Sequence, residues 1–303
     1  MNEMKILPPK GKADVVLDTD TWNEADDQYA LSYLLKNSDA LSTKAVYAAP
    51  FLNKKVETPK EGMEKSYDEI MRILDLNGRA DLKTEVYRGS ERYLENEKTP
   101  VDSAAARDLV RRAAGYTRED PLYVVAIGCI TNIASALLLD PSIAERTVVV
   151  WLGGHAHHWS DTGEFNMAQD IAAARVVMNS GVRFVQLPCK GVVSEFRTTR
   201  YELEHWIGNK NPLCDHLLKG TYRKVESYAS LDSAWSRVIW DVTAVAWLLN
   251  TDERFMFTRE CEIRLPGYDR RYEERGNGKY MTYVYGINRD ALMEDLFNKL
   301  TNK

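Results

Sequence analysis

The sequence predicts an α/β fold with a mostly parallel, Rossmann-like central sheet and helices on both faces. Short, continuously apolar segments alternate with segments of helical periodicity along most of the 303 residues. Strands that are apolar throughout are typical of parallel sheets, because both faces of such sheets are covered. No glycine-, serine- or proline-rich linker and no internal repeat divides the chain, so we expect one domain over residues 1–303.

The first half of the chain gives regular pairs of strand and helix. The expected strands are short and rich in apolar or β-branched residues, and they lie at residues 15–17, 45–49, 85–87 and 122–127. The expected helices have apolar side chains three and four positions apart and lie at residues 26–36, 59–76, 103–114 and 132–139. Asp140-Pro141 ends the last of these helices, since proline cannot continue one.

The second half continues this alternation and then changes character. Strands are expected at residues 148–152 and 183–187, with a helix at 168–178 between them. Residues 201–235 are helical, rich in Tyr, Trp and His, and without a strong strand, which favours a cap over the open edge of the sheet. A charged, glycine-bearing loop or hairpin at 265–278 leads to a last apolar segment at 280–285.

Composition and charge exclude several classes of protein. The 40 Lys+Arg residues against 45 Asp+Glu residues give a net charge of −5, which argues against a nucleic-acid polymer as partner. No segment approaches the ~18 apolar residues that a membrane span needs, and no apolar leader opens the chain, so we expect a cytoplasmic protein. The four cysteines form no C-x-x-C pair, which disfavours a disulfide scaffold or a thiolate zinc site.

Four aspartates gather where the first strand meets the first helix. Asp18 and Asp20 point to one side at the end of the strand, and Asp26 and Asp27 open the helix. In a parallel sheet, the carboxyl end of a strand is where ligands bind. Carboxylates this close raise one another's pKa unless a cation compensates them, and Ca²⁺ prefers such oxygen donors. The cluster therefore predicts a metal site, because helix capping alone would need only one of the four.

The segment D-T-D-x(5)-D-D-Q-Y-A-L resembles the D-x-D-x-G-x-D-D motif of the inosine-uridine-preferring nucleoside hydrolase family. Three further segments follow in the order of that family: G-C-I-T-N, then G-G with E-F-N-x-x-x-D, and finally W-D-V-T-A. The resemblance spans about residues 15–244. It implies the nucleoside hydrolase fold and Ca²⁺-dependent hydrolysis of the N-glycosidic bond of ribonucleosides to ribose and a nucleobase. It also implies a homodimer or homotetramer that acts on small ribosides, and the lack of a long apolar segment argues against a membrane partner.

The same resemblance assigns roles to individual residues. Asp20 would be the general base on a metal-bound water. The implied Ca²⁺ ligands are Asp20, Asp27, the backbone carbonyl of Thr131, and Asp241. The implied or candidate substrate contacts are Asp26, Glu164, Asn166, Trp240, His158 and Asn53.

This chain departs from the family pattern at three places. The first loop has two extra residues between Asp20 and Asp26. Ala49-Pro50-Phe51 stands where the family often has an asparagine, and Asn53 is the nearest substitute. Trp240 replaces the histidine that protonates the leaving base in many members, and the indole N–H does not titrate.

Other residues could supply the missing proton, and other functions stay open. Candidates for the acid are His157, His158 and Tyr222. Without an acid, the chain could be a metal-dependent nucleoside or sugar binding protein. A haloacid-dehalogenase-type phosphohydrolase also opens with D-x-D, but it needs Thr or Val where this chain has Trp22. The H-x-H-H cluster at residues 155–158 lacks a nearby cysteine, which favours a loop over the pocket rather than a zinc site.

Overall fold

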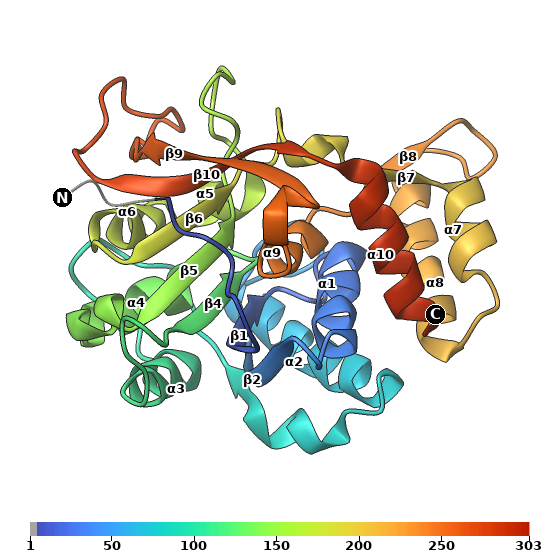
Figure 1. Ribbon diagram of the computed structural model, residues 1–303, viewed down its shortest axis with the longest axis horizontal. Coiled ribbons are helices and arrows are strands. Elements are labelled where there is room, and N and C mark those ends of the chain that lie inside the picture. The colour runs from blue at the N-terminus through green and yellow to red at the C-terminus, as the bar shows by residue number, and fades with distance from the viewer. Residues whose placement is uncertain (1–4, 303) are drawn as a thin grey trace.

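Within residues 5–302, the part of the chain that the computed structural model describes, an eight-stranded sheet forms the centre of the molecule (Figure 1). Its strands are β1 (Ala13–Thr19), β2 (Leu41–Ala48), β3 (Val86–Arg88), β4 (Leu122–Ala126), β5 (Thr147–Leu152), β6 (Arg183–Leu187), β9 (Met256–Glu262) and β10 (Tyr280–Ile287). They lie in the order β3-β2-β1-β4-β5-β6-β10-β9. Only β9, at one edge, runs antiparallel to its neighbour in this sheet, so the predicted mostly parallel sheet is confirmed.

Helices cover both faces of the sheet, and successive strand residues alternate between two buried cores. Val15 and Leu17 of β1 pack into one core, whereas Val16 between them packs into the other. The first core includes residues of α1 (Ala25–Lys36), α2 (Pro59–Leu76), α9 (Val242–Trp247) and α10 (Arg289–Thr301). The second includes residues of α3 (Ala104–Ala113), α4 (Thr131–Leu139) and α6 (Ile171–Asn179). Burial on both faces explains why the strands are apolar throughout.

The segment expected as a cap contains α7 (Arg200–Ile207) and α8 (Pro212–Glu226). Two short strands, β7 (Arg197–Thr199) and β8 (Ser236–Val238), flank it and pair antiparallel in a separate sheet. Figure 1 shows these elements beside α10, away from α3 and α4. β8 ends two residues before Trp240, and Asp241 then directly precedes α9. Because α9 packs against α1, the chain passes from this segment to the first turn of that helix pair.

Some elements differ from the sequence-based expectation. The helix expected at residues 168–178 is broken into α5 (Phe165–Gln169) and α6, because the Asp170 side chain accepts a hydrogen bond from the Ala173 N–H and caps α6. The strand β9 and the helix α10 were not predicted. Residues 265–278 contain an isolated bridge between Pro266 and Tyr272 rather than a regular hairpin.

Residues 5–302 contain no helix that is both long and apolar enough to cross a bilayer. The expectation that no leader opens the chain rests partly on residues 1–4, which lie outside the described residues.

Candidate functional site

A cavity of about 490 Å³ lies at the carboxyl ends of the central strands. Asp20 follows β1, Ile127 follows β4, Leu152 ends β5, and Cys189 follows β6; all four line the cavity. Strand order reverses between β1 and β4, and open α/β sheets bind ligands in the crevice at such a switch point. The strand topology therefore places this cavity where a ligand site is expected.

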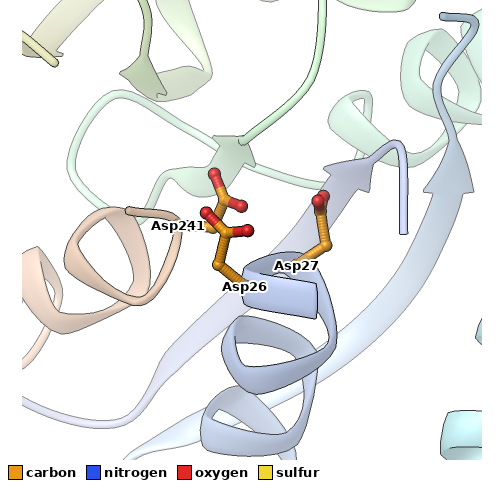
Figure 2. Close-up of side chains that lie close together, drawn as sticks. All are labelled: Asp26, Asp27 and Asp241. Atoms are coloured by element: carbon orange, nitrogen blue, oxygen red, sulfur yellow. The ribbon is translucent and has the colours of Figure 1, made fainter. Parts of the chain in front are cut away.

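Three buried carboxylates converge at one side of this cavity. One oxygen from each of Asp26, Asp27 and Asp241 lies within 4.8 Å of the other two. Figure 2 shows Asp26 and Asp27 in the first turn of α1, with Asp241 reaching toward them from the turn before α9. Burial raises the pKa of Asp27 and of Asp241 well above the usual range, and the neighbouring carboxylates raise both further. Three carboxylates in this arrangement can all be ionised together only if a cation compensates them.

Asp20 lies beside this group of three rather than inside it. Its charge is the largest carboxylate contribution to the raised pKa of Asp27. Burial raises the pKa of Asp20 itself to about 8, although the Asn23 side-chain amide donates a hydrogen bond to its Oδ2 at 2.9 Å. A Cβ atom at Gly128 would lie 3.1 Å from Asp20 Oδ1, so the loop after β4 passes directly against this carboxylate.

Two other residues of the sequence motifs, Thr131 and Asp18, are buried without lining the cavity. Thr131 begins α4, is fully buried, and donates its hydroxyl to Asp170 Oδ2 at 2.6 Å. Thr131, whose backbone carbonyl was the predicted metal ligand, is not among the residues that line the cavity. Asp18 accepts a hydrogen bond from the Asn132 amide at 2.7 Å, while its Oδ2 has no partner among the described residues. Burial raises the pKa of Asp18 to about 7.

Glu164 and Asn166 line the cavity in fixed orientations. Glu164 caps α5, and its two carboxylate oxygens accept hydrogen bonds from the backbone N–H groups of Gly154, Asn166 and Met167. The Asn166 amide donates to the backbone carbonyls of Ile127 and Leu152, both at 3.0 Å. These bonds tie both side chains to the ends of β4 and β5.

The remaining predicted substrate residues divide between two cavities. Trp240 and Asn53 line the first, and the Asn53 amide donates to Asn23 Oδ1 at 2.7 Å, which extends the chain of bonds that begins at Asp20. His158 instead lines a separate cavity of about 320 Å³, together with His157. The structure therefore does not bring His158 to the carboxylates, because the loop after β5 turns it away.

The histidine that lines the first cavity is His155, which the sequence analysis did not select. Its Nδ1 accepts a hydrogen bond from the Lys190 backbone N–H at 3.3 Å, so in the neutral ring the proton is on Nε2. Burial, with a smaller contribution from Lys190, lowers the pKa of His155 to about 4. Tyr222, a predicted acid, donates its hydroxyl to Glu204 and does not line the cavity.

Several charged residues of the cavity wall were also missed. Lys190 directly follows Cys189 after β6, so its place at the carboxyl end of a strand was a usable signal. Lys224 of α8 and Arg237 of β8 also line the cavity and pair with Glu24 in the first loop. No local pattern marks these two, because only the folded position of α8 and β8 brings them to the site.

Comparison with known proteins identifies the family. Residues 15–294 match the family model described as inosine-uridine preferring nucleoside hydrolase. The non-specific ribonucleoside hydrolase RihC of Escherichia coli is 30% identical over 167 residues, which are 53% of this chain and 51% of that protein. The pyrimidine-specific ribonucleoside hydrolase RihA of Salmonella newport is 26% identical over 249 residues, which are 71% of this chain and 77% of that protein. The match to RihC thus spans about half the length of that relative.

Solved structures agree on the fold. A plant nucleoside hydrolase has a TM-score of 0.73 to this chain at 18% identity, with 96% of this chain and 99% of that one covered. At 18% sequence identity, this structural similarity supports only a shared fold. The family model, however, covers nearly all of the described chain, from the first strand to the last helix. The chain belongs to the inosine-uridine preferring nucleoside hydrolase family.

Proposed function

We propose that this protein hydrolyses the N-glycosidic bond of ribonucleosides and releases ribose and a nucleobase. The observation that carries the proposal is the group of buried carboxylates, Asp26, Asp27 and Asp241 with Asp20 beside them, at the switch point of the sheet. Family membership supports the same reaction, and the named relatives are ribonucleoside hydrolases. The family match gives no support to the phosphohydrolase alternative.

The site suits a hard divalent cation, and we propose Ca²⁺. Its donors are carboxylate oxygens, which favour Ca²⁺ over zinc, a metal that prefers nitrogen and sulfur ligands. Asp27 and Asp241 would hold the ion, with Asp20 and the Thr131 carbonyl as the further ligands that the family resemblance implies. When bound, the ion would supply Lewis-acid activation of water and a binding point for ribose hydroxyls.

Asp20 would accept the proton of the attacking water. The Asn23 amide holds its Oδ2, and Asn53 in turn holds Asn23, so the carboxylate cannot rotate freely. A base that is fixed within reach of its proton typically contributes about 10²–10⁴-fold to the rate. The longer first loop of this chain thus supplies a residue, Asn23, that orients the proposed base.

Asp26, Glu164 and Asn166 would orient the sugar. Breaking an N-glycosidic bond passes through an oxocarbenium-like transition state, in which positive charge develops on the ring. Fixed carboxylates near the ring stabilise that charge without having to reorganise during the reaction. Glu164 is held by three backbone N–H groups, so its orientation is already set before the substrate binds.

The leaving nucleobase needs a proton or a hydrogen-bond donor, and we propose His155 for this role in place of Trp240. With a pKa lowered to about 4, the His155 ring is neutral near pH 7 and carries its proton on Nε2, which lies 4.0 Å from Asp161 Oδ1 and would serve as the donor. A neutral imidazole stabilises developing negative charge without a full proton transfer, as in other enzymes that use a neutral histidine as electrophile.

Turnover on a panel of ribonucleosides and a nitrophenyl riboside, with and without a chelator, tests the proposed function. We expect release of ribose that stops when the chelator is added and returns with Ca²⁺. Tight nucleoside binding without any ribose release would instead support the nucleoside or sugar binding protein. Restoration by Zn²⁺ but not by Ca²⁺ would contradict the proposed cation.

The homodimer or homotetramer and the cytoplasmic location belong to the same proposal, because both follow from the family resemblance or from the sequence. Light scattering on the purified protein measures its oligomeric state directly. A monomer at micromolar concentration would contradict the proposed assembly.

A further inference from the structure

Arg237 links the carboxylate cluster to the segment beside it. This arginine lies on β8, its side chain is only 12% exposed, and it lines the cavity. Its Nη2 donates a hydrogen bond to Asp26 Oδ1 at 3.0 Å and also contacts Glu24 Oε2. Lys224 of α8 contacts the other oxygen of Glu24. Two cationic side chains from residues 201–238 therefore hold the start of α1.

The two adjacent aspartates of α1 have different partners as a result. Asp27 accepts its hydrogen bond from the neutral hydroxyl of Thr19 at 2.7 Å, so its charge is not balanced by that partner. Asp26 is bonded to a guanidinium, which occupies one oxygen and offsets the charge of the group. A carboxylate that already has a cationic partner is a weaker ligand for a metal ion than one whose partner is a hydroxyl.

We infer that Arg237 is a positioning residue that withdraws Asp26 from the metal and fixes it as a hydrogen-bond acceptor for a sugar hydroxyl. The inference rests on the proposed function. It gives the physical reason why Asp26 would orient the sugar, although its position within 4.8 Å of Asp27 and Asp241 would otherwise allow it to bind the ion. Since Arg237 also contacts Glu24, the orientation of Asp26 depends on the position of β8.

The test compares Arg237→Gln with Arg200→Gln. Arg200 lies in the same segment, on α7, and pairs with Glu204 at 2.7 Å and Asp232 at 3.2 Å, but it does not line the cavity. For Arg237→Gln we expect KM to rise about 10–100-fold, which is the typical effect of losing a charge-assisted hydrogen bond, with a much smaller change in kcat. Ca²⁺ affinity, measured by calorimetry, should stay equal or become tighter. Arg200→Gln should change KM by about twofold at most.

Arg237→Lys tests whether the charge of the Arg237 side chain is sufficient or whether its planar shape is also needed. A lysine keeps the positive charge but lacks the planar fork that contacts two carboxylates at once, so its KM should lie between those of the wild type and Arg237→Gln. Loss of Ca²⁺ affinity in Arg237→Gln, as large as the loss in Asp27→Ala, would overturn the inference. An unchanged KM in Arg237→Gln would overturn it as well.

Binding of free ribose in the presence of Ca²⁺ separates this inference from the proposed reaction. If the wild-type protein binds ribose but turns over no riboside, the proposed function fails while the inference is still tested. In that case Arg237→Gln should weaken ribose binding about 10–100-fold, and Arg200→Gln should not. A protein that binds no ribose with Ca²⁺ present would overturn the inference.

Discussion

The carboxylates of the cavity differ in what holds each of them, and we expect this difference to separate their functions. Asp20 is held by an amide, Asp27 by a hydroxyl, Asp26 by a guanidinium and Glu164 by backbone N–H groups. Neutral donors orient a carboxylate and leave its charge in place, whereas a guanidinium also offsets that charge. Variants of single residues can therefore separate binding of the metal, activation of water and binding of the sugar.

Asp20→Asn keeps an oxygen at the same place but cannot accept a proton. We expect kcat to fall about 10²–10⁴-fold while substrate binding persists, because the general base is lost and the shape is kept. Steady-state kinetics and substrate calorimetry measure the two effects. Asp81→Asn is the control, since Asp81 is an exposed partner of Arg79 on the surface. Near-normal turnover in Asp20→Asn would show that another group activates the water.

His155→Ala should slow inosine cleavage far more than cleavage of a nitrophenyl riboside. Nitrophenolate leaves without assistance, whereas hypoxanthine needs a donor, so we expect about 10²-fold loss of kcat on inosine alone. Because the pKa of His155 is lowered to about 4, the loss should be constant from about pH 5.5 to 8. His158→Ala, in the separate cavity, should affect neither substrate. An equal loss on both substrates would mean that His155 shapes the cavity instead.

Among the secondary-structure elements, the break between α5 and α6 supports the site most directly. Asp170 at this break is 4% exposed and accepts three hydrogen bonds, from the Ala173 N–H, the Leu94 N–H and the Thr131 hydroxyl. It therefore joins the helix after the E-F-N segment to the start of α4. The Asp that follows E-F-N in the sequence motif is structural here rather than exposed to the cavity.

Asp170→Ala should lower the free energy of unfolding by about 2–4 kcal/mol. The variant loses a helix cap and leaves a buried N–H and a buried hydroxyl without their acceptor, and these losses add. Ser103→Ala removes a cap whose hydroxyl oxygen accepts one hydrogen bond, from the Ala106 N–H, and should cost about 1 kcal/mol. Urea denaturation of both variants measures the difference. Equal losses would show that the buried bonds of Asp170 contribute little.

Local patterns predicted most elements, and together with the family resemblance they selected several residues that line the cavity; tertiary contacts explain the rest. The helix at residues 59–76 was predicted to the residue, because Thr58 caps it and Pro59 starts it. The edge strand β9 was missed because only its first two residues, Met256 and Phe257, form an apolar run and charged residues dominate the rest. Of the cavity residues, Asp20, Asp26 and Asp27 lie in one short motif. Arg237 reaches the cavity because β8 pairs with β7 beside it. His155 reaches it because its ring is held by the Lys190 backbone N–H.

At the scale of the whole molecule, the buried carboxylates link metal binding to the stability of the fold. The purified protein should contain about one Ca²⁺ per chain, and Asp27→Ala should lose it, because Asp27 is a member of the convergent group. Elemental analysis measures both. Ca²⁺ that binds the folded state should also raise Tm with its concentration. Full occupancy in Asp27→Ala would contradict the proposed ligand set.

The same carboxylates predict how stability depends on pH when the metal is removed. The pKa of Asp18 is raised to about 7 and that of Asp20 to about 8, both above the value of 3.8 for a free side chain. A carboxyl group whose pKa is raised by folding contributes stability that is fully present below that free value and is lost as pH rises through the folded value. In chelator, Tm should therefore fall between about pH 5 and pH 8.

Thermal unfolding across this range, with and without Ca²⁺, measures the effect. Ca²⁺ should restore Tm most at the upper end of the range, where the carboxylates have lost their protons. Asp20→Asn should flatten the dependence seen in chelator, since one of the titrating groups is gone. A Tm in chelator that does not change with pH would contradict this account of the site.

The pairing of α1 with α9 also has a consequence for biosynthesis. Asp26 and Asp27 lie near the beginning of the chain and Asp241 lies near its end, yet the three converge (Figure 2). The segment with the first two carboxylates therefore leaves the ribosome long before Asp241. More than two hundred residues must be synthesised between them before the three side chains can come together. Until then the nascent protein cannot form the complete metal site, so the ion should be acquired only after Asp241 has left the ribosome.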